Sequence, residues 1–175
     1  PQALSIPAHP AEQAANGPAV LDAMLWQPAG RGPHPAIILL HGCAGMRNRA
    51  GQPFPRDTDW AQRLSRLGYL VLQLDSLTPR GESSLCGQGN DRRIRVSVER
   101  ARDAYAALLF LQARSDVKPD RIALMGWSNG GGTVLWTLGR DNRARPAGLR
   151  HDFAAAVAFY PGCRTLSERR DPWQP

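Results

Sequence analysis

Four strand-length apolar runs alternate with segments of helical periodicity, and this alternation constrains the fold more than any other feature of the sequence. We expect buried strands at residues 36–40, 69–74, 121–125 and 153–159, and a further strand at 19–26. We expect helices at residues 59–67, 92–113 and 129–138. Strands that alternate with helices favour a parallel sheet joined by right-handed crossovers. The sequence therefore predicts the α/β class, with a mostly parallel sheet and helices on both faces.

The length and the N-terminal composition suggest how the chain is organised. The 175 residues suit one domain, and no apolar run reaches the roughly 18 residues of a transmembrane helix. Residues 1–18 are rich in Pro, Ala and Gln, so we expect an irregular arm there, with at most a short strand at 4–6. Residues 19–175 are expected to form the α/β domain.

The chain is basic, with a formal net charge of +7 at pH 7. A basic balance is typical of proteins that bind nucleic acid or anionic surfaces. Here, however, 21 arginines and one lysine are scattered along the sequence rather than clustered. We therefore expect a solvated basic surface and no nucleic-acid partner.

The pentapeptide Gly126-Trp-Ser-Asn-Gly130 matches the pattern G-x-S-x-G and lies between an expected strand and an expected helix. In that context the pattern predicts a nucleophile elbow, a tight turn that raises the serine hydroxyl above the sheet. The alternative is a glycine-rich phosphate-binding turn, but no lysine follows Ser128 and the spacing is not G-x-x-x-x-G-K. Ser128 is therefore the candidate catalytic nucleophile.

A second loop, His41-Gly-Cys-Ala-Gly45, follows the apolar run at 36–40. Attack by a serine on a carbonyl produces a negatively charged oxygen, which two backbone N–H groups can stabilise. We assign these oxyanion-hole groups to Cys43 and Asn129, with Ala44 as the alternative to Cys43. His41 is expected to hold this loop by hydrogen bonds, and the alternatives are that it acts as a general base or contacts the substrate.

Four segments together resemble the dienelactone hydrolase family of the α/β-hydrolase superfamily. They are HGCAG at 41–45, LGYLVLQLDSLTPRG at 67–81, DRIALMGWSNGG at 120–131 and AVAFYPGC at 156–163. The resemblance implies the α/β-hydrolase fold and cleavage of a carboxylic ester or lactone through an acyl-enzyme, with no cofactor or metal. The family's namesake enzymes carry a cysteine nucleophile, so Ser128 looks more like the nucleophile of a general carboxylic-ester hydrolase.

Three further residues are candidates for substrate binding. Arg80 could bind a substrate carboxylate, or it could be an ordinary surface arginine. Trp127 could line the acyl pocket or pack beneath the turn. Tyr160 follows a strand at the same edge of the sheet and is expected to form a wall of the site.

The resemblance implies that an Asp and a His of the catalytic triad follow later strands than those present here. His151 precedes the run at 153–159 and Asp75 lacks a histidine partner, so both are poor substitutes. We therefore expect the triad Asp and His beyond residue 175, in a missing segment or a second chain, and residues 19–175 to be an incomplete domain. The alternatives are an intact short protein without catalysis and a non-catalytic α/β-hydrolase-like binding module.

The chain has three cysteines. In the family's strand order Cys43 and Cys86 lie at the same sheet edge, so a disulfide between them is feasible, and Cys163 would pair outside this chain. The alternative is three reduced thiols. A disulfide would imply a periplasmic or secreted protein, and a cytoplasmic location is expected otherwise.

Overall fold

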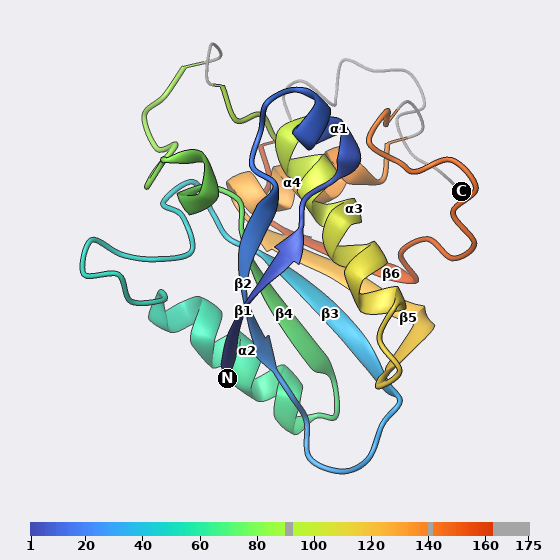
Figure 1. Ribbon diagram of the computed structural model, residues 1–175. Coiled ribbons are helices and arrows are strands. Elements are labelled where there is room, and N and C mark those ends of the chain that lie inside the picture. The colour runs from blue at the N-terminus through green and yellow to red at the C-terminus, as the bar shows by residue number, and fades with distance from the viewer. Residues whose placement is uncertain (90–92, 140–141, 163–175) are drawn as a thin grey trace.

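The computed structural model describes residues 1–89, 93–139 and 142–162, and within them the chain forms one six-stranded sheet with helices on both faces (Figure 1). The strands are β1 (Gln2–Pro7), β2 (Val20–Trp26), β3 (His34–Leu40), β4 (Leu70–Asp75), β5 (Val117–Trp127) and β6 (Ala155–Phe159). The helices are α1 (Pro10–Ala14), α2 (Pro55–Arg66), α3 (Glu99–Gln112) and α4 (Asn129–Thr137), with a 3-10 turn, η1, at Thr78–Arg80.

The strand order is β1-β2-β4-β3-β5-β6. Strands β3, β4, β5 and β6 are parallel, whereas β1 and β2 are antiparallel to their neighbours. In β3, Leu40 pairs with Leu74 of β4 and with Gly126 of β5, so the carboxyl ends of the three strands are level. The loops that follow these strands therefore meet at one edge of the sheet, where ligands bind in open α/β sheets. The predicted fold class is confirmed.

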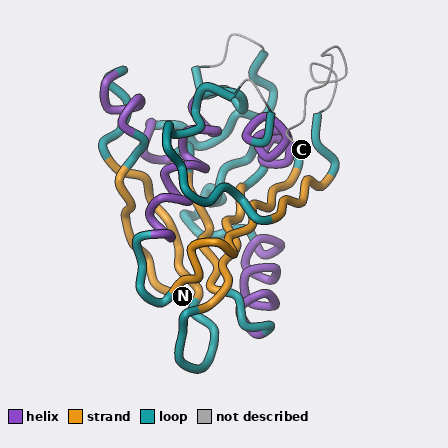
Figure 2. The backbone as a smooth tube through the Cα atoms, turned by 90° about the vertical axis from the view of Figure 1, so that its right-hand side faces the viewer, coloured by secondary structure: helices purple, strands orange, loops and turns teal. Residues whose placement is uncertain are grey.

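The core lies on both faces of the sheet. Apolar residues of α3 and α4 pack with inward residues of β1 to β5 on one face, and α2 covers the other face with Ala61, Trp60 and Leu64. Figure 2 shows these layers from the side. Successive side chains of a strand point to opposite faces of the sheet, and helices cover both faces. Continuous apolar runs such as Ile37–Leu40 are therefore buried throughout.

The N-terminal residues are more regular than the expected arm, whose short strand at 4–6 lies within a longer strand. They form β1, which pairs along its whole length with β2, and α1, whose first turn is capped by the His9 ring. Among the residues of β1 only Ile6 is buried, so the strand carries little apolar signal of its own. Pairing with a neighbouring strand stabilises it instead, which a local pattern cannot reveal.

Two helices begin at other residues than expected. α2 begins at Pro55, four residues before Asp59, because proline is well suited to the first helical turn. α3 begins at Glu99 rather than near residue 92. The Glu99 carboxylate accepts a hydrogen bond from the Arg95 N–H at 2.7 Å, which closes a turn just before the helix.

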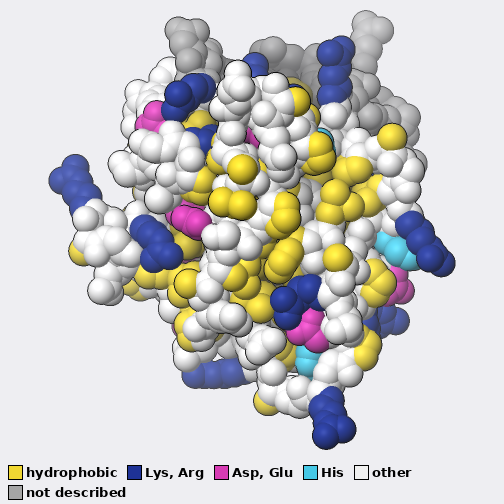
Figure 3. Space-filling model, in the orientation of Figure 1, with side chains coloured by type: hydrophobic (Ala, Val, Ile, Leu, Met, Phe, Trp, Pro, Cys, Tyr) yellow, Lys and Arg dark blue, Asp and Glu magenta, His cyan; other side chains and the backbone are white. Residues whose placement is uncertain are grey.

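The molecular surface agrees with the scattered charges of the sequence. On the face drawn in Figure 3, basic side chains are spread among acidic and uncharged ones. None of the helices in the described ranges combines the length and the apolar character needed to cross a membrane.

Candidate active site

Ser128 is the single residue between β5 and α4, and its backbone is strained. Its φ is 52° and its ψ is −113°, a conformation that residues with a side chain rarely adopt. The Ser128 N–H donates to the Phe159 carbonyl at 3.0 Å, and the Ser128 carbonyl accepts from the Gly132 N–H at 2.9 Å. Neighbouring strand and helix therefore hold the turn in place.

The two glycines of the pentapeptide are required by close backbone contacts. A Cβ at Gly126 would lie 2.5 Å from the Gly130 carbonyl oxygen, and a Cβ at Gly130 would overlap the carbonyl oxygens of Leu40 and His41. Neither backbone neighbour can move away cheaply. The strand thus turns into the helix only when both positions lack a side chain.

The loop after β3 lies beside Ser128. A Cβ at Gly42 would be 3.9 Å from the Ser128 Cβ. In the part of the chain that the structure describes, the backbone N–H groups of Cys43 and Asn129 donate to no acceptor. The Asn129 N–H belongs to the first residue of α4, where helical N–H groups have no partner within the helix. Two free donors therefore stand on the two backbone segments that meet at Ser128.

A cavity of about 330 Å³ opens above these groups, and we call it the Ser128 pocket. It is lined by Gly42, Cys43, Ala44, Gly45, Phe54, Pro55, Arg56, Ser128 and Tyr160. Within the described ranges, the Ser128 hydroxyl makes no hydrogen bond. The pocket therefore presents a partly exposed hydroxyl with no protein partner to compete for it.

Arg56 is the charged residue of this pocket, and it was not predicted from the sequence. Its Nη1 donates to the Tyr160 hydroxyl at 2.9 Å, its Nε donates to Asp57 at 2.7 Å, and its guanidinium lies 5.0 Å from the Trp127 ring centroid. Burial raises the pKa of Asp57, and Arg56 opposes that effect. The proline before Arg56 was the available signal, because it marks a helix start that places Arg56 in the first turn.

Of the two aromatic candidates, only Tyr160 lines the Ser128 pocket. Its side chain is exposed and its hydroxyl meets Arg56, as expected of a wall residue. Trp127 is buried instead, stacked on Phe159 with ring centroids 6.0 Å apart and packed against Trp60. Its proposed contact with substrate was wrong, because successive side chains of a strand point to opposite faces and Trp127 points toward α2.

Arg80 is not available to a substrate either. Its guanidinium donates to both oxygens of Asp103 and to Glu12, each at 2.8 Å, and its side chain is 6% exposed. Burial lowers the pKa of Arg80, but the bonds and charges of Asp103 and Glu12 outweigh burial and raise it above its usual value. The predicted substrate contact was wrong because the Arg80 guanidinium already binds carboxylates of α1 and α3.

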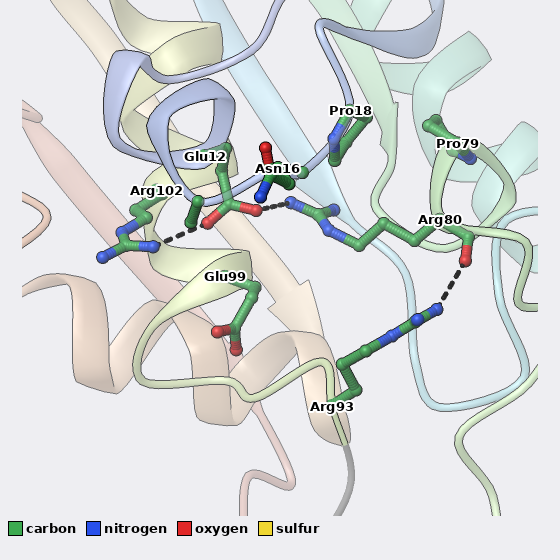
Figure 4. A pocket seen from close by; sticks show the side chains of 10 residues that line it. Glu12, Asn16, Pro18, Pro79, Arg80, Arg93, Glu99 and Arg102 are labelled. Carbon is green, nitrogen blue, oxygen red and sulfur yellow. Dashed lines mark hydrogen bonds and ion pairs between the residues drawn. The ribbon is translucent and has the colours of Figure 1, made fainter.

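Arg80 borders a second cavity of about 430 Å³, which we call the Arg80 cavity. Its lining residues are Glu12, Ala15, Asn16, Gly17, Pro18, Pro79, Arg80, Arg93, Glu99 and Arg102. Figure 4 shows the Glu12 carboxylate between Arg102 and Arg80, and Arg93 reaching the Arg80 carbonyl. The Ser128 pocket and this cavity share no lining residue.

His41 holds the loop after β3 and does not line the Ser128 pocket. Its side chain is buried, its Nε2 accepts from the Ser76 N–H at 3.2 Å, and its Nδ1 lies 2.7 Å from the Gly42 carbonyl. These contacts fit a neutral ring with its proton on Nδ1. Burial, followed by the charge of Arg100, lowers the pKa of His41 to about 3. Of the expectations for His41, the loop-holding one matches these contacts, whereas a substrate contact and a general base do not fit a ring that is buried outside the pocket.

A disulfide links Cys43 to Cys86 across the two loops. The same loops are joined by a hydrogen bond from the Leu85 N–H to the Cys43 carbonyl at 2.7 Å, and Gly45 approaches the Ser83 carbonyl closely. The loop carrying the free Cys43 N–H is therefore held at several points. Cys163 lies outside the described residues.

All four histidines of the sequence lie in the described ranges, and none of them contacts the Ser128 hydroxyl. His9 caps α1, His34 begins β3 at its far end, and His151 precedes β6. Asp75 accepts hydrogen bonds from the N–H groups of Leu77 and Thr78 and caps that turn. The described residues thus supply a hydroxyl and N–H donors but no histidine base for Ser128.

Comparisons with known proteins agree with this architecture. "Putative hydrolase YtaP" of Bacillus subtilis is 29% identical over 128 residues, and the quorum-quenching protein AidA of Acinetobacter baumannii is 31% identical over 121 residues. These matches cover 65% and 69% of this chain but only 42% and 36% of the relatives, so the chain spans less than half the length of either. The crystal structure of the α/β hydrolase GrgF from Penicillium sp. sh18 superposes with a TM-score of 0.62 at 22% identity, covering 91% of this chain and 45% of GrgF.

The sequence profile of the prolyl oligopeptidase family matches residues 57–165, which include β4, β5, β6 and the Ser128 turn. With the level strand ends and the strand-to-helix turn, this match places the fold in the α/β-hydrolase superfamily. The chain therefore belongs to the prolyl oligopeptidase family.

Proposed function

We propose that this chain carries the nucleophile and the oxyanion hole of a serine hydrolase that cleaves a carboxylic ester or lactone. One observation carries the proposal: the Ser128 hydroxyl lies at a strained strand-to-helix turn beside two N–H groups, and none of the three bonds another residue of the described ranges. Strain of this kind persists only where the surrounding structure enforces it, and it gathers at functional sites.

In the proposed reaction the Ser128 oxygen attacks the carbonyl carbon while a base accepts the hydroxyl proton. The carbonyl electrons move to the oxygen, and the N–H groups of Cys43 and Asn129 stabilise the resulting negative charge. The intermediate collapses, the ester C–O bond breaks, and the leaving alcohol takes the proton back from the base. Water then attacks the acyl-enzyme by the same route and releases the acid together with free Ser128.

The base and its acid are proposed to be a His and an Asp that follow residue 175. Support comes from the four histidines of the chain, which cap a helix, begin a strand, precede a strand or are buried in the loop after β3. His41 could not serve, because its low pKa and its two ring contacts leave no nitrogen for Ser128. The proposed mechanism uses no metal or organic cofactor.

Ester cleavage is favoured by the resemblance of four segments to dienelactone hydrolases, whereas the family match favours cleavage of a peptide bond. Both reactions pass through an acyl-enzyme on Ser128 and need the same oxyanion donors. They differ in the leaving group, since an amine needs a proton to depart and an alkoxide leaves more readily. A peptidase is therefore the second candidate function.

The test compares p-nitrophenyl esters, a lactone and aminoacyl p-nitroanilides as substrates of the intact polypeptide that carries these residues. We expect ester or lactone turnover to exceed anilide turnover, and Ser128→Ala to lower it by at least about 10⁴-fold. Ser65→Ala on α2 is the matched control, because the Ser65 hydroxyl bonds the Gln27 carbonyl, away from Ser128. Faster anilide turnover would favour the peptidase, and folded wild-type protein that turns over none of these substrates would favour a non-catalytic binding module. Equal turnover by Ser128→Ala would contradict Ser128 as the nucleophile.

The proposed location is the periplasm or the cell exterior. The Cys43–Cys86 disulfide supports it, since disulfides persist mainly in oxidising compartments. The proposed partners are a small ester or lactone and the polypeptide that supplies the base.

A further inference from the structure

Arg100, the second residue of α3, is the largest fully buried side chain of the described core. Its Nη2 donates to the His41 carbonyl at 2.8 Å, and its Nη1 donates to the Asn129 side-chain oxygen. The two acceptors belong to different backbone segments, one at the end of β3 and one at the start of α4. A single guanidinium therefore bridges them.

These are the two segments that carry the proposed oxyanion donors. Asn129 supplies one N–H group itself, and His41 lies two residues before Cys43, which supplies the other. The segments also touch directly, because a Cβ at Gly130 would overlap the carbonyl oxygens of Leu40 and His41. The distance between the Cys43 and Asn129 N–H groups therefore depends on how the end of β3 is held against the start of α4.

We propose that Arg100 is a positioning residue, which sets the separation of the Cys43 and Asn129 N–H groups through its two hydrogen bonds. The inference rests on the proposed function, since it assigns these groups to the oxyanion. Oxyanion donors must lie about 2.7–3.1 Å from the developing charge, and a misplacement of about 1 Å can cost about 100-fold in rate.

The chemistry of arginine suits this role. Its planar guanidinium presents two terminal nitrogens at fixed relative positions, so two acceptors held by it are also fixed relative to each other. Bonds from an ionised donor are stronger than those between neutral groups. A lysine would offer one compact ammonium on a flexible stem, so it would not hold two acceptors at a fixed separation as the guanidinium does.

His41 braces the same loop from the other side. Its ring lies between the Gly42 carbonyl and the Ser76 N–H. Because the ring stays neutral at ordinary pH, it fixes the loop without adding a second charge beside Arg100. Arg100 remains the group that connects this loop to α4.

The experiment measures fluorophosphonate labelling rates, together with kcat and KM for a p-nitrophenyl ester, in the intact polypeptide. We expect Arg100→Met to lower kcat and the labelling rate by about 30–100-fold, with KM changed less than about threefold, because the donors act mainly on the transition state. Arg100→Lys should recover part of this loss. The matched control is Arg102→Met on the same helix, whose guanidinium bonds Glu12 and not the Ser128 turn, and it should leave both rates within about twofold.

Asn129→Ala provides a second route if Arg100→Met does not fold, since it removes the acceptor of Arg100 and keeps the backbone N–H. Its effect should be non-additive with Arg100→Lys, as for groups that act as a unit. Full additivity, or unchanged kcat in folded Arg100→Met, would overturn the inference alone. A folded wild-type protein that resists labelling would overturn the proposed function and this inference together.

Discussion

The Ser128 pocket and the Arg80 cavity differ in how their polar groups are satisfied. The Arg80 cavity is the larger, about 430 Å³ against 330 Å³, and it holds more charge. Yet its buried charges pair with one another: Glu12 binds Arg80 and Arg102, and Asp103 binds Arg80. In the Ser128 pocket the Ser128 hydroxyl and the Cys43 N–H bond nothing in the described chain, and neither does the N–H of Asn129, the residue that follows Ser128.

The contrast teaches that unsatisfied groups identify a reactive site better than volume or charge. A buried ion pair whose partners are complete stabilises a fold only modestly, but breaking it is costly. The N–H group at the start of α4, in contrast, has no acceptor within the helix and can bind a ligand. We therefore expect the Arg80 cavity to govern stability and the Ser128 pocket to govern turnover.

The largest expected effect is that of Arg80→Met. The substitution leaves the buried carboxylates of Glu12 and Asp103 without this partner, so we expect the free energy of unfolding to fall by about 3–5 kcal/mol. Turnover per folded molecule should not change. Denaturant unfolding and ester hydrolysis measure the two quantities. Arg93→Met, at an exposed position of the same cavity, should change stability by less than about 0.5 kcal/mol. A fall in turnover for Arg80→Met would erase the distinction between the two cavities.

Reduction of the Cys43–Cys86 disulfide, which lies beside the Ser128 pocket, should lower both the unfolding free energy and the reactivity of Ser128. A dithiol reductant converts the bond to two thiols and is itself oxidised to a disulfide. For a sequence separation of 43 residues, chain entropy predicts a loss of about 3–4 kcal/mol in unfolding free energy. Labelling of Ser128 should also slow, because Cys43 carries a proposed oxyanion donor. Unfolding and labelling with and without dithiothreitol test this, and the Cys43→Ala/Cys86→Ala variant, as the control, should not respond to reductant.

The pH dependence of stability should report His41. Its pKa is about 3 in the folded protein against an ordinary value of 6.5, so between those values the unfolded chain binds a proton that the folded chain does not. Stability therefore falls as the pH falls through this window, by about 1.5 kcal/mol from pH 6.5 to 5. Urea unfolding of the wild type and of His41→Gln at several pH values measures the contribution. Identical pH profiles for the two proteins would show that His41 is not buried as described.

The smallest expected effect compares two residues with positive φ. Ser128→Gly relieves backbone strain and should raise the unfolding free energy by about 1 kcal/mol while removing activity. Asn16 lines the Arg80 cavity and has a φ of 57°. Asn16→Gly should raise the unfolding free energy by only a few tenths of a kcal/mol, since asparagine tolerates positive φ. Thermal unfolding distinguishes the two. An equal gain at both positions would mean that the Ser128 turn stores no particular strain.

The sequence was sufficient to predict the parallel part of the sheet and the position of Ser128. Continuous apolar runs mark β3 and β4, and the glycines around Ser128 reflect backbone contacts that leave no room for a side chain. Both signals are local. β1 was anticipated only as a short strand at residues 4–6, because its stability comes from pairing with β2, and a strand with one buried residue resembles a loop in sequence.

Side-chain partners were harder to predict. Arg80 was chosen because it follows β4 near the site, but Glu12 and Asp103, which are distant in sequence, occupy its guanidinium. Arg56 was overlooked because the fold brings it into contact with Tyr160, which lies 104 residues later in the sequence. An arginine's function depends on which carboxylates the fold brings to it, and a single sequence does not specify those contacts.

The most direct test of the account is to locate a fluorophosphonate adduct by mass spectrometry of the folded, intact polypeptide. We predict one adduct, on the peptide that contains Ser128, and none on Ser128→Ala. An adduct on another residue, or no adduct on folded protein with its base present, would contradict the assignment of Ser128 as the nucleophile.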